Sequence, residues 1–168
     1  GAKMKGVILA GGEGTRLRPF TYVTNKHLAN VHESVMIRYP LETLVNAGIN
    51  DISIICGDTQ EGDIFQLLGN GSELKDRLGI KEKINLTYAI QRSNNPKSRR
   101  GAYGIAHALS LAEDFVGKEK IAVVLGDNFF ENDVKNHAEN FENNIYGAKI
   151  FLKEVNDPER FGIAEIVD

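Results

Sequence analysis

The chain has little cysteine, little surplus charge and no long apolar run. One cysteine excludes an internal disulfide framework, and Cys56, which follows an apolar run, is predicted to be a buried, inert thiol. No apolar run approaches the roughly 20 residues of a membrane-spanning helix, and no segment before the first predicted strand resembles a signal peptide. These absences predict a protein of the reducing cytoplasm with no membrane partner.

Positive and negative charges are nearly balanced in this chain. A formal charge of −3 and a pI of about 5.8 argue against broad binding to nucleic acid or anionic membranes, so we expect a small-molecule ligand. With 168 residues, 42% of them hydrophobic, the chain fits one α/β domain over residues 1–168. Residues 1–2 (Gly-Ala) resemble a tag remnant and are expected to contribute nothing to the fold.

Apolar periodicity predicts alternating strands and helices. Strands are expected at Lys5–Ala10, Ile52–Cys56, Ile84–Ile90, Ile121–Leu125 and Lys149–Leu152. Helical spacing is found at residues 37–47, 61–68 and 105–112, with Gly48 and Gly69 as stop signals. This order predicts a three-layer α/β/α fold with a mostly parallel, Rossmann-like sheet.

Two polar stretches are expected to be loops. Asn70–Lys83 is charged and bounded by glycine, and Arg92–Gly101 is polar and basic. The second stretch has two interpretations that the residues leave open. It is either a solvated surface loop or a basic flap over bound phosphates.

The segment Leu9–Pro19 (LAGGEGTRLRP) is the most informative part of the chain. Glycine backbone without Cβ atoms lets N–H groups approach anionic oxygens closely, and Arg16 adds a fixed positive charge. The alternative is a plain glycine-rich turn. A Walker A loop is excluded because no Gly-Lys-Ser/Thr follows, and the dinucleotide fingerprint fails at Leu17.

Polar residues follow three of the predicted strands. They are Gly11–Arg16, Gln91 and the Gly-Asp-Asn sequence at 126–128. Ligands of open parallel sheets bind beyond the carboxyl ends of the strands, so these residues are expected at one edge. Asp127 is the candidate Mg²⁺ ligand beside bound phosphates, and Lys26 is a candidate phosphate contact if its segment folds back.

Four separated segments resemble the sugar-1-phosphate nucleotidyltransferase family, in the correct order and at roughly the correct spacing: Leu9–Pro19, Asn25–Leu28, Val124–Asn128 and Asn156–Gly162. Within the family, the likeness is to the glucose-1-phosphate thymidylyltransferases, and it runs from Lys5 to the last residue. The resemblance implies attack of a sugar 1-phosphate, with glucose 1-phosphate expected, on the α-phosphorus of dTTP or UTP. The products would be a dTDP-sugar for polysaccharide biosynthesis and pyrophosphate, with Mg²⁺ as cofactor.

The resemblance also implies roles for individual residues. The catalytic set is Arg16 on the β- and γ-phosphates, Lys26 between the α-phosphate and the leaving group, and Asp127 as the Mg²⁺ ligand. The nucleotide-binding set is Leu9, Gly11, Gly12, Gly14, Thr15, Gln91 and Gly104, with Gln91 and the Gly104 backbone on the pyrimidine edge. Asn128 and Gly162 are implied sugar contacts, and a homo-oligomer is compatible with the family.

Some positions depart from the family pattern. Asn30 and Val35 stand where prolines are usual, and the loss of two φ-fixing residues predicts a looser segment around Lys26. An insertion around Asn94–Arg100 lengthens the connection between Gln91 and Gly104. A Glu-Lys-Pro segment and a second metal-binding Asp, which follow in the family, are not in this sequence.

These departures leave several hypotheses open. The chain is expected to be either a fold truncated at its C-terminus or a naturally shortened relative. In the first case it is the nucleotide-binding portion of an enzyme, and in the second a non-catalytic sensor of nucleotides or nucleotide-sugars. A related enzyme that uses UTP, CTP or ATP is a third hypothesis.

Overall fold

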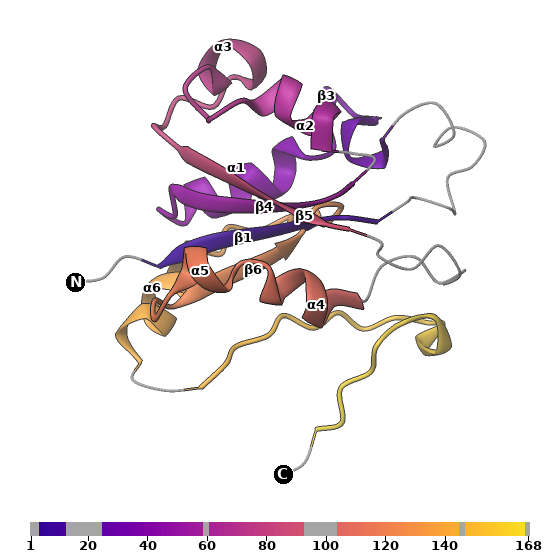
Figure 1. The fold of residues 1–168 in the computed structure, drawn as a ribbon. Coiled ribbons are helices and arrows are strands. Elements are labelled where there is room, and N and C mark those ends of the chain that lie inside the picture. Colours follow the sequence, from indigo (N-terminus) through magenta and orange to yellow (C-terminus); the bar gives the residue numbers. More distant parts are fainter. Residues whose placement is uncertain (1–3, 13–24, 59–60, 93–103, 145–146, 167–168) are drawn as a thin grey trace.

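A central sheet of four parallel strands organises the chain in a computed structural model that describes residues 4–12, 25–58, 61–92, 104–144 and 147–166 (Figure 1). The strands are β1 (Lys5–Ala10), β4 (Asp51–Gly57), β5 (Asn85–Gln91) and β6 (Ile121–Leu125), in the order β5-β4-β1-β6. β1 and β4 are near-continuous apolar runs because helices cover both faces of a parallel sheet.

Helices form a layer on each side of the sheet (Figure 1). On one side lie α1 (Arg38–Asn46), α2 (Glu61–Leu68) and α3 (Leu74–Leu78), which share the larger buried core with Ile8 and Ile54. On the other side lie α4 (Gly104–Ser110) and α5 (Glu113–Val116), and Ala108 and Ala112 there pack against Val7, Leu9 and Ile55. This arrangement confirms the predicted three-layer α/β/α fold.

The strand order reverses between β1 and β6. From β1 the chain proceeds outward through β4 to β5, and it then returns to place β6 on the other side of β1. In open parallel sheets, such a reversal leaves a crevice outside the carboxyl ends of the two strands between which it occurs. The residues that follow β1 and β6 therefore border the expected ligand position.

The segment around Lys26, for which a looser structure is predicted, carries backbone hydrogen bonds. It contains the 3₁₀ turn η3 (Lys26–Leu28) and a short antiparallel pair, β2 (Asn30–Val31) with β3 (Ser34–Val35). The Met36 N–H donates to the Ala29 carbonyl at 2.9 Å, and the Ile37 N–H donates to the His27 carbonyl at 2.8 Å. The hairpin and these hydrogen bonds connect the segment that carries Lys26 to the start of α1.

Two predictions need correction. The helix predicted at 105–112 ends at Ser110 as α4, and a tight turn follows, in which the Ala112 N–H donates to the Leu109 carbonyl at 3.0 Å, before the separate helix α5 begins at Glu113. Asn70–Lys83 is not a plain loop, because it contains α3, whose Leu74 and Leu78 are buried. Two apolar residues four positions apart bury one face of this single turn, which the charged composition concealed.

The predicted strand at Lys149–Leu152 is absent. After α6 (Lys135–Asn143), residues 147–157 carry no regular structure, and Ile150 and Leu152 are exposed. Residues 147–151 and β6 border a cavity of about 740 Å³. A strand requires a partner within hydrogen-bonding distance, and here the cavity lies where that ladder would form.

Cys56 is buried in β4, as predicted. Burial raises the pKa of this thiol to about 12, with a smaller contribution from the charge of Glu61. Within the described ranges, every helix is too short or too polar to span a membrane.

Candidate functional site

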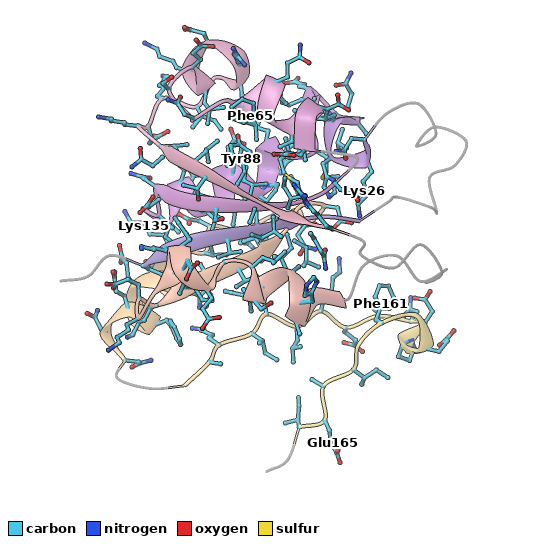
Figure 2. The ribbon with its side chains drawn as sticks, in the orientation of Figure 1. Lys26, Phe65, Tyr88, Lys135, Phe161 and Glu165 are labelled. Carbon is cyan, nitrogen blue, oxygen red and sulfur yellow. The ribbon has the colours of Figure 1, made fainter. Side chains whose placement is uncertain are left out.

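Two loops at the strand reversal lie beside the side chain of Lys26. Gly11 and Gly12 follow β1, and Gly126 and Asp127 follow the adjacent strand β6. The Lys26 Nζ donates to Asp127 Oδ2 at 2.7 Å, and a Cβ placed on Gly12 would lie 3.1 Å from that same Nζ (Lys26 is labelled in Figure 2). The glycine turn, the lysine and the carboxylate therefore converge at one rim of the sheet.

The ion pair is partly open to solvent. The Lys26 side chain is 19% exposed and that of Asp127 is 45% exposed. Burial raises the pKa of the Asp127 carboxyl. The hydrogen bond from Lys26 and its positive charge lower the pKa and outweigh burial, so it lies below its ordinary value of 3.8. Asp127 is thus ionised at neutral pH, and a ligand reaches both charges without a rearrangement of the core.

A buried histidine supports this rim. Asn25 Oδ1 accepts the His27 backbone N–H at 2.9 Å and lies 2.9 Å from His27 Nδ1. Because that oxygen is an acceptor, His27 carries its proton on Nδ1. Burial and the neighbouring charge of Lys26 lower the pKa of His27 to about 4, although Asp127 raises it slightly, so the ring is neutral at pH 7.

Gly126 lies against the ring of His27. A Cβ at Gly126 would lie 2.7 Å from His27 Cδ2 and 3.1 Å from the Ala10 Cβ, closer than side chains normally approach. The Gly126 N–H donates to the Leu9 carbonyl at 2.8 Å. This close packing sets the position of the β6 end, and with it the position of Asp127.

Gln91 lies at the end of β5, where its side chain is 7% exposed. Its Nε2 lies 3.3 Å from the Gly104 carbonyl oxygen and 3.2 Å from His107 Nδ1. A Cβ on Gly11 would lie 2.8 Å from Gln91 Oε1. The amide therefore lies between the glycine turn and the first turn of α4.

The remaining predicted site residues are placed differently. The side chain of Leu9 packs into the core beneath α4, and Asn128 borders the cavity beside β6. Gly162 is exposed in the chain after η4 (Pro158–Arg160), and its neighbour Phe161 lies well apart from Lys26 in Figure 2. A Cβ on Gly162 would meet no atom within 4 Å. Gly14, Thr15 and Arg16 lie outside the described residues.

Three residues with a part in the site were not singled out from the sequence: Asn25, His27 and His107. Asn25 directly precedes η3 and accepts the N–H two residues on, which is the pattern of an N-terminal cap. His107 follows Gly104 by one helical turn, so its side chain leans back toward that residue. These two spacings were the available signals, whereas the contact of His27 with Gly126 has no local signature.

The donor set at the rim suits a hard cation that shares phosphate ligands. The described part of the chain holds no group of three or more His, Cys, Asp or Glu side chains able to enclose a metal ion. Mg²⁺ is commonly held by one or two carboxylates together with substrate phosphates and water. Asp127, half exposed beside the glycine turn, fits that pattern.

The family model for nucleotidyl transferases matches residues 5–168, from β1 to the end of the chain. The chain belongs to the nucleotidyl transferase family. The resemblance carried by the four sequence segments is thereby confirmed at the level of the family.

Two characterised relatives illustrate the range of similar proteins. The low-salt glycan biosynthesis nucleotidyltransferase Agl11 of Haloferax volcanii is 39% identical over 165 residues, which are 98% of this chain and 42% of that protein. A glucose-1-phosphate thymidylyltransferase of Neisseria meningitidis is 37% identical over 163 residues, 96% of this chain and 51% of that enzyme. The chain thus spans about half the length of the curated relatives it matches.

Solved structures share the fold. A Bacillus anthracis protein, provisionally assigned as a glucose-1-phosphate thymidylyltransferase and crystallised with sucrose, is 44% identical. It superposes with a TM-score of 0.84 over 98% of this chain and 60% of its own. A UDP-glucose pyrophosphorylase in complex with UDP-glucose has a TM-score of 0.65 over 83% of this chain at 23% identity, which is a likeness of fold alone.

Proposed function

We propose that the chain is the nucleotide-binding part of an enzyme that transfers a nucleotidyl group from dTTP, or UTP, to a sugar 1-phosphate. Glucose 1-phosphate is the proposed acceptor. The observation that carries the proposal is the convergence of Gly12, Lys26 and Asp127 at the strand reversal. Thymidylyltransferases among the relatives support the choice of nucleotide and sugar. We also propose a cytoplasmic location, in keeping with the buried reduced Cys56.

In the proposed reaction, a phosphate oxygen of the sugar 1-phosphate forms a bond to the α-phosphorus, and the bond from that phosphorus to the pyrophosphate oxygen breaks. Such a transfer depends on positioning and on neutralising negative charge. Lys26 would donate to phosphate oxygens bound over the glycine turn, in place of its present bond to Asp127. Arg16, in the same loop, would bind the β- and γ-phosphates.

Asp127 would hold Mg²⁺ through one carboxylate oxygen. When bound, the ion supplies positive charge beside the phosphates and stabilises the leaving pyrophosphate. Ionised Asp127 is ready for this role at neutral pH, because the charge of Lys26 already keeps its pKa low. Exchange of the Lys26 partner from carboxylate to phosphate would release Asp127 for the metal.

A second candidate function is nucleotide binding without transfer. It is favoured by one observation: the proposed sugar contact Gly162 lies in an exposed segment, where a Cβ would meet no atom within 4 Å. Release of pyrophosphate from dTTP and glucose 1-phosphate by the intact protein would exclude this candidate. Binding of dTTP by the intact protein with no pyrophosphate release, at any sugar phosphate concentration, would favour it.

Calorimetry with dTTP and Mg²⁺ tests the proposed nucleotide site. We expect Lys26→Ala to weaken binding by about 10- to 100-fold, because it removes a hydrogen bond from a charged donor worth about 1.5–3 kcal/mol. Arg16→Ala is expected to act in the same direction. Absence of dTTP and UTP binding at millimolar concentration, with unchanged behaviour of both variants, would refute the proposal.

Lys135→Ala provides the matched control. Lys135 is an exposed lysine at the start of α6, on the far side of the molecule from Lys26 in Figure 2. Its substitution by alanine removes the same charge as Lys26→Ala. It should leave dTTP affinity unchanged. An equal loss in both lysine variants would indicate a nonspecific charge effect in place of a site at Lys26.

A further inference from the structure

The environment of the Gln91 amide determines which of its atoms a ligand can use. The Gly104 carbonyl oxygen is only an acceptor, so the Gln91 atom 3.3 Å away must be the nitrogen. The second atom near that nitrogen is His107 Nδ1, at 3.2 Å. A primary amide has two hydrogens, and these two acceptors are positioned to take both.

The opposite end of the amide faces the glycine turn. Gln91 Oε1 lies so close to Gly11 that a Cβ there would be 2.8 Å away. Gln91 is 7% exposed, so its amide is held in a confined site. In this setting the side chain offers a nucleobase an acceptor oxygen and no remaining N–H.

We infer that His107 is a positioning residue for base selection, which holds Gln91 so that only its Oε1 is available to a nucleobase. The inference rests on the proposed function, because it assumes a nucleotide at this edge. An acceptor there matches bases with a ring N–H, such as the N3–H of thymine and uracil. The Gln91 oxygen disfavours cytosine, because cytosine N3 is also an acceptor. Two acceptors that face each other in a buried site would both lack a hydrogen-bond donor.

The fold favours this role for His107. Side chains of an α-helix lean toward its N-terminus, so a residue one turn after Gly104 is directed back over that residue. His107 is partly buried, whereas Ala108 beside it packs into the core beneath β1. Substitution of His107 is therefore compatible with the fold, and its contact with Gln91 can be tested separately.

The hydrogen bond has a signature that needs no nucleotide. His107 Nδ1 accepts a hydrogen bond from Gln91 only in the neutral tautomer that carries its hydrogen on Nε2. Long-range proton–nitrogen NMR spectra of the imidazole, assigned by their loss in His107→Asn, should show this tautomer. Hydrogen on Nδ1 in the neutral ring would overturn the inference, because two donors would then face each other.

Base selectivity is the second readout. In calorimetry with Mg²⁺, wild type should bind dTTP more tightly than CTP, and His107→Leu should lower the dTTP-to-CTP affinity ratio about tenfold, the equivalent of one hydrogen bond. His107→Asn, which keeps an acceptor oxygen near the Nδ1 position, should retain the ratio. Equal melting temperatures of His107→Leu and His107→Asn would show that a difference in their affinity ratios does not come from a difference in folding.

The outcomes distinguish the two proposals. If wild type prefers dTTP and His107→Leu keeps the same ratio, the inference about His107 fails while the proposed function stands. If wild type binds none of the nucleotides, the proposed function fails, and base selection at Gln91 fails with it. Uniform weakening of dTTP and CTP by His107→Leu would also overturn the inference, because the ratio would be unchanged.

Discussion

The sheet region and the segment at 147–166 bury similar residues to very different extents. Ile8 and Ile54, in the middle of β1 and β4, are almost fully buried, and so is the polar His27 in η3. In the later segment, Ile150, Leu152 and Ile163 expose 61–74% of their surface. An apolar pattern becomes a strand in one region and not in the other, because only the first has a hydrogen-bonding partner beside it.

This contrast shows which part of the described structure contributes most to the free energy of unfolding. Burial of apolar surface contributes roughly 25 cal/mol per Å², so side chains in the sheet contribute most and those at 147–166 contribute little. The chemistry follows the same division. Lys26 and Asp127 are held in place by the packed region, whereas Gly162 lies in the exposed one.

The largest contrast is expected for isoleucine. Ile54→Ala should lower the free energy of unfolding by about 2–5 kcal/mol, because Ile54 has no exposed surface and its removal leaves a cavity. Ile163→Ala should change it by less than about 0.5 kcal/mol. Urea unfolding measures both. A large effect at Ile163 would indicate that this segment is packed in solution.

The next effect is pH dependence through His27. Its folded pKa of about 4 lies below the ordinary 6.5, so the unfolded chain binds more protons between these values. The free energy of unfolding should therefore fall as pH is lowered from about 6.5 to 4, by about 3 kcal/mol in total. Unfolding measured across this range should be flatter in His27→Gln. An identical slope in the variant would assign the effect to other groups.

A pair of glycines extends the comparison to the backbone. Gly126→Ala should cost about 1–3 kcal/mol, because the new Cβ would meet the buried His27 ring at 2.7 Å. Gly162→Ala meets no atom within 4 Å and should be close to neutral. Thermal unfolding of the two variants provides the measurement. Equal melting temperatures would show that the β6 end moves without cost.

The smallest stability effect is expected at the ion pair. Asp127→Asn should alter the free energy of unfolding by less than about 1 kcal/mol, since the pair is partly exposed. It should nevertheless abolish the dependence of nucleotide affinity on Mg²⁺. Calorimetry with and without Mg²⁺ tests this separation. Retained Mg²⁺ dependence would remove Asp127 from the proposed metal site.

Much of the fold was predictable from local pattern. The helix at Glu61–Leu68 matches its prediction in both bounds, because helical spacing and the following Gly69 are local signals. The shared edge of Gly11, Gln91 and Asp127 followed from the rule that parallel strands end on one side. The chemical roles assigned to these residues stay predictions, to be tested by the binding experiments above.

Other features had no local signal. The strand expected at Lys149–Leu152 depended on a partner edge, which its own apolar run does not specify. The position of Lys26 involves the hydrogen bonds of a neighbouring hairpin, which has no local signal at Lys26 itself. The contact of His107 with Gln91 joins residues 16 positions apart. The length of the connection between them does not indicate where its two ends lie in space.

The sequence by itself determined the alternation of strands and helices, the family and the candidate chemical groups, because periodicity and motif spacing are properties of short segments. The tertiary structure alone decided that Lys26 meets Asp127, 101 residues later, and that His27 lies against Gly126. Contacts at such separations depend on how layers pack around the sheet. Packing is a property of the whole chain, so no single segment encodes it.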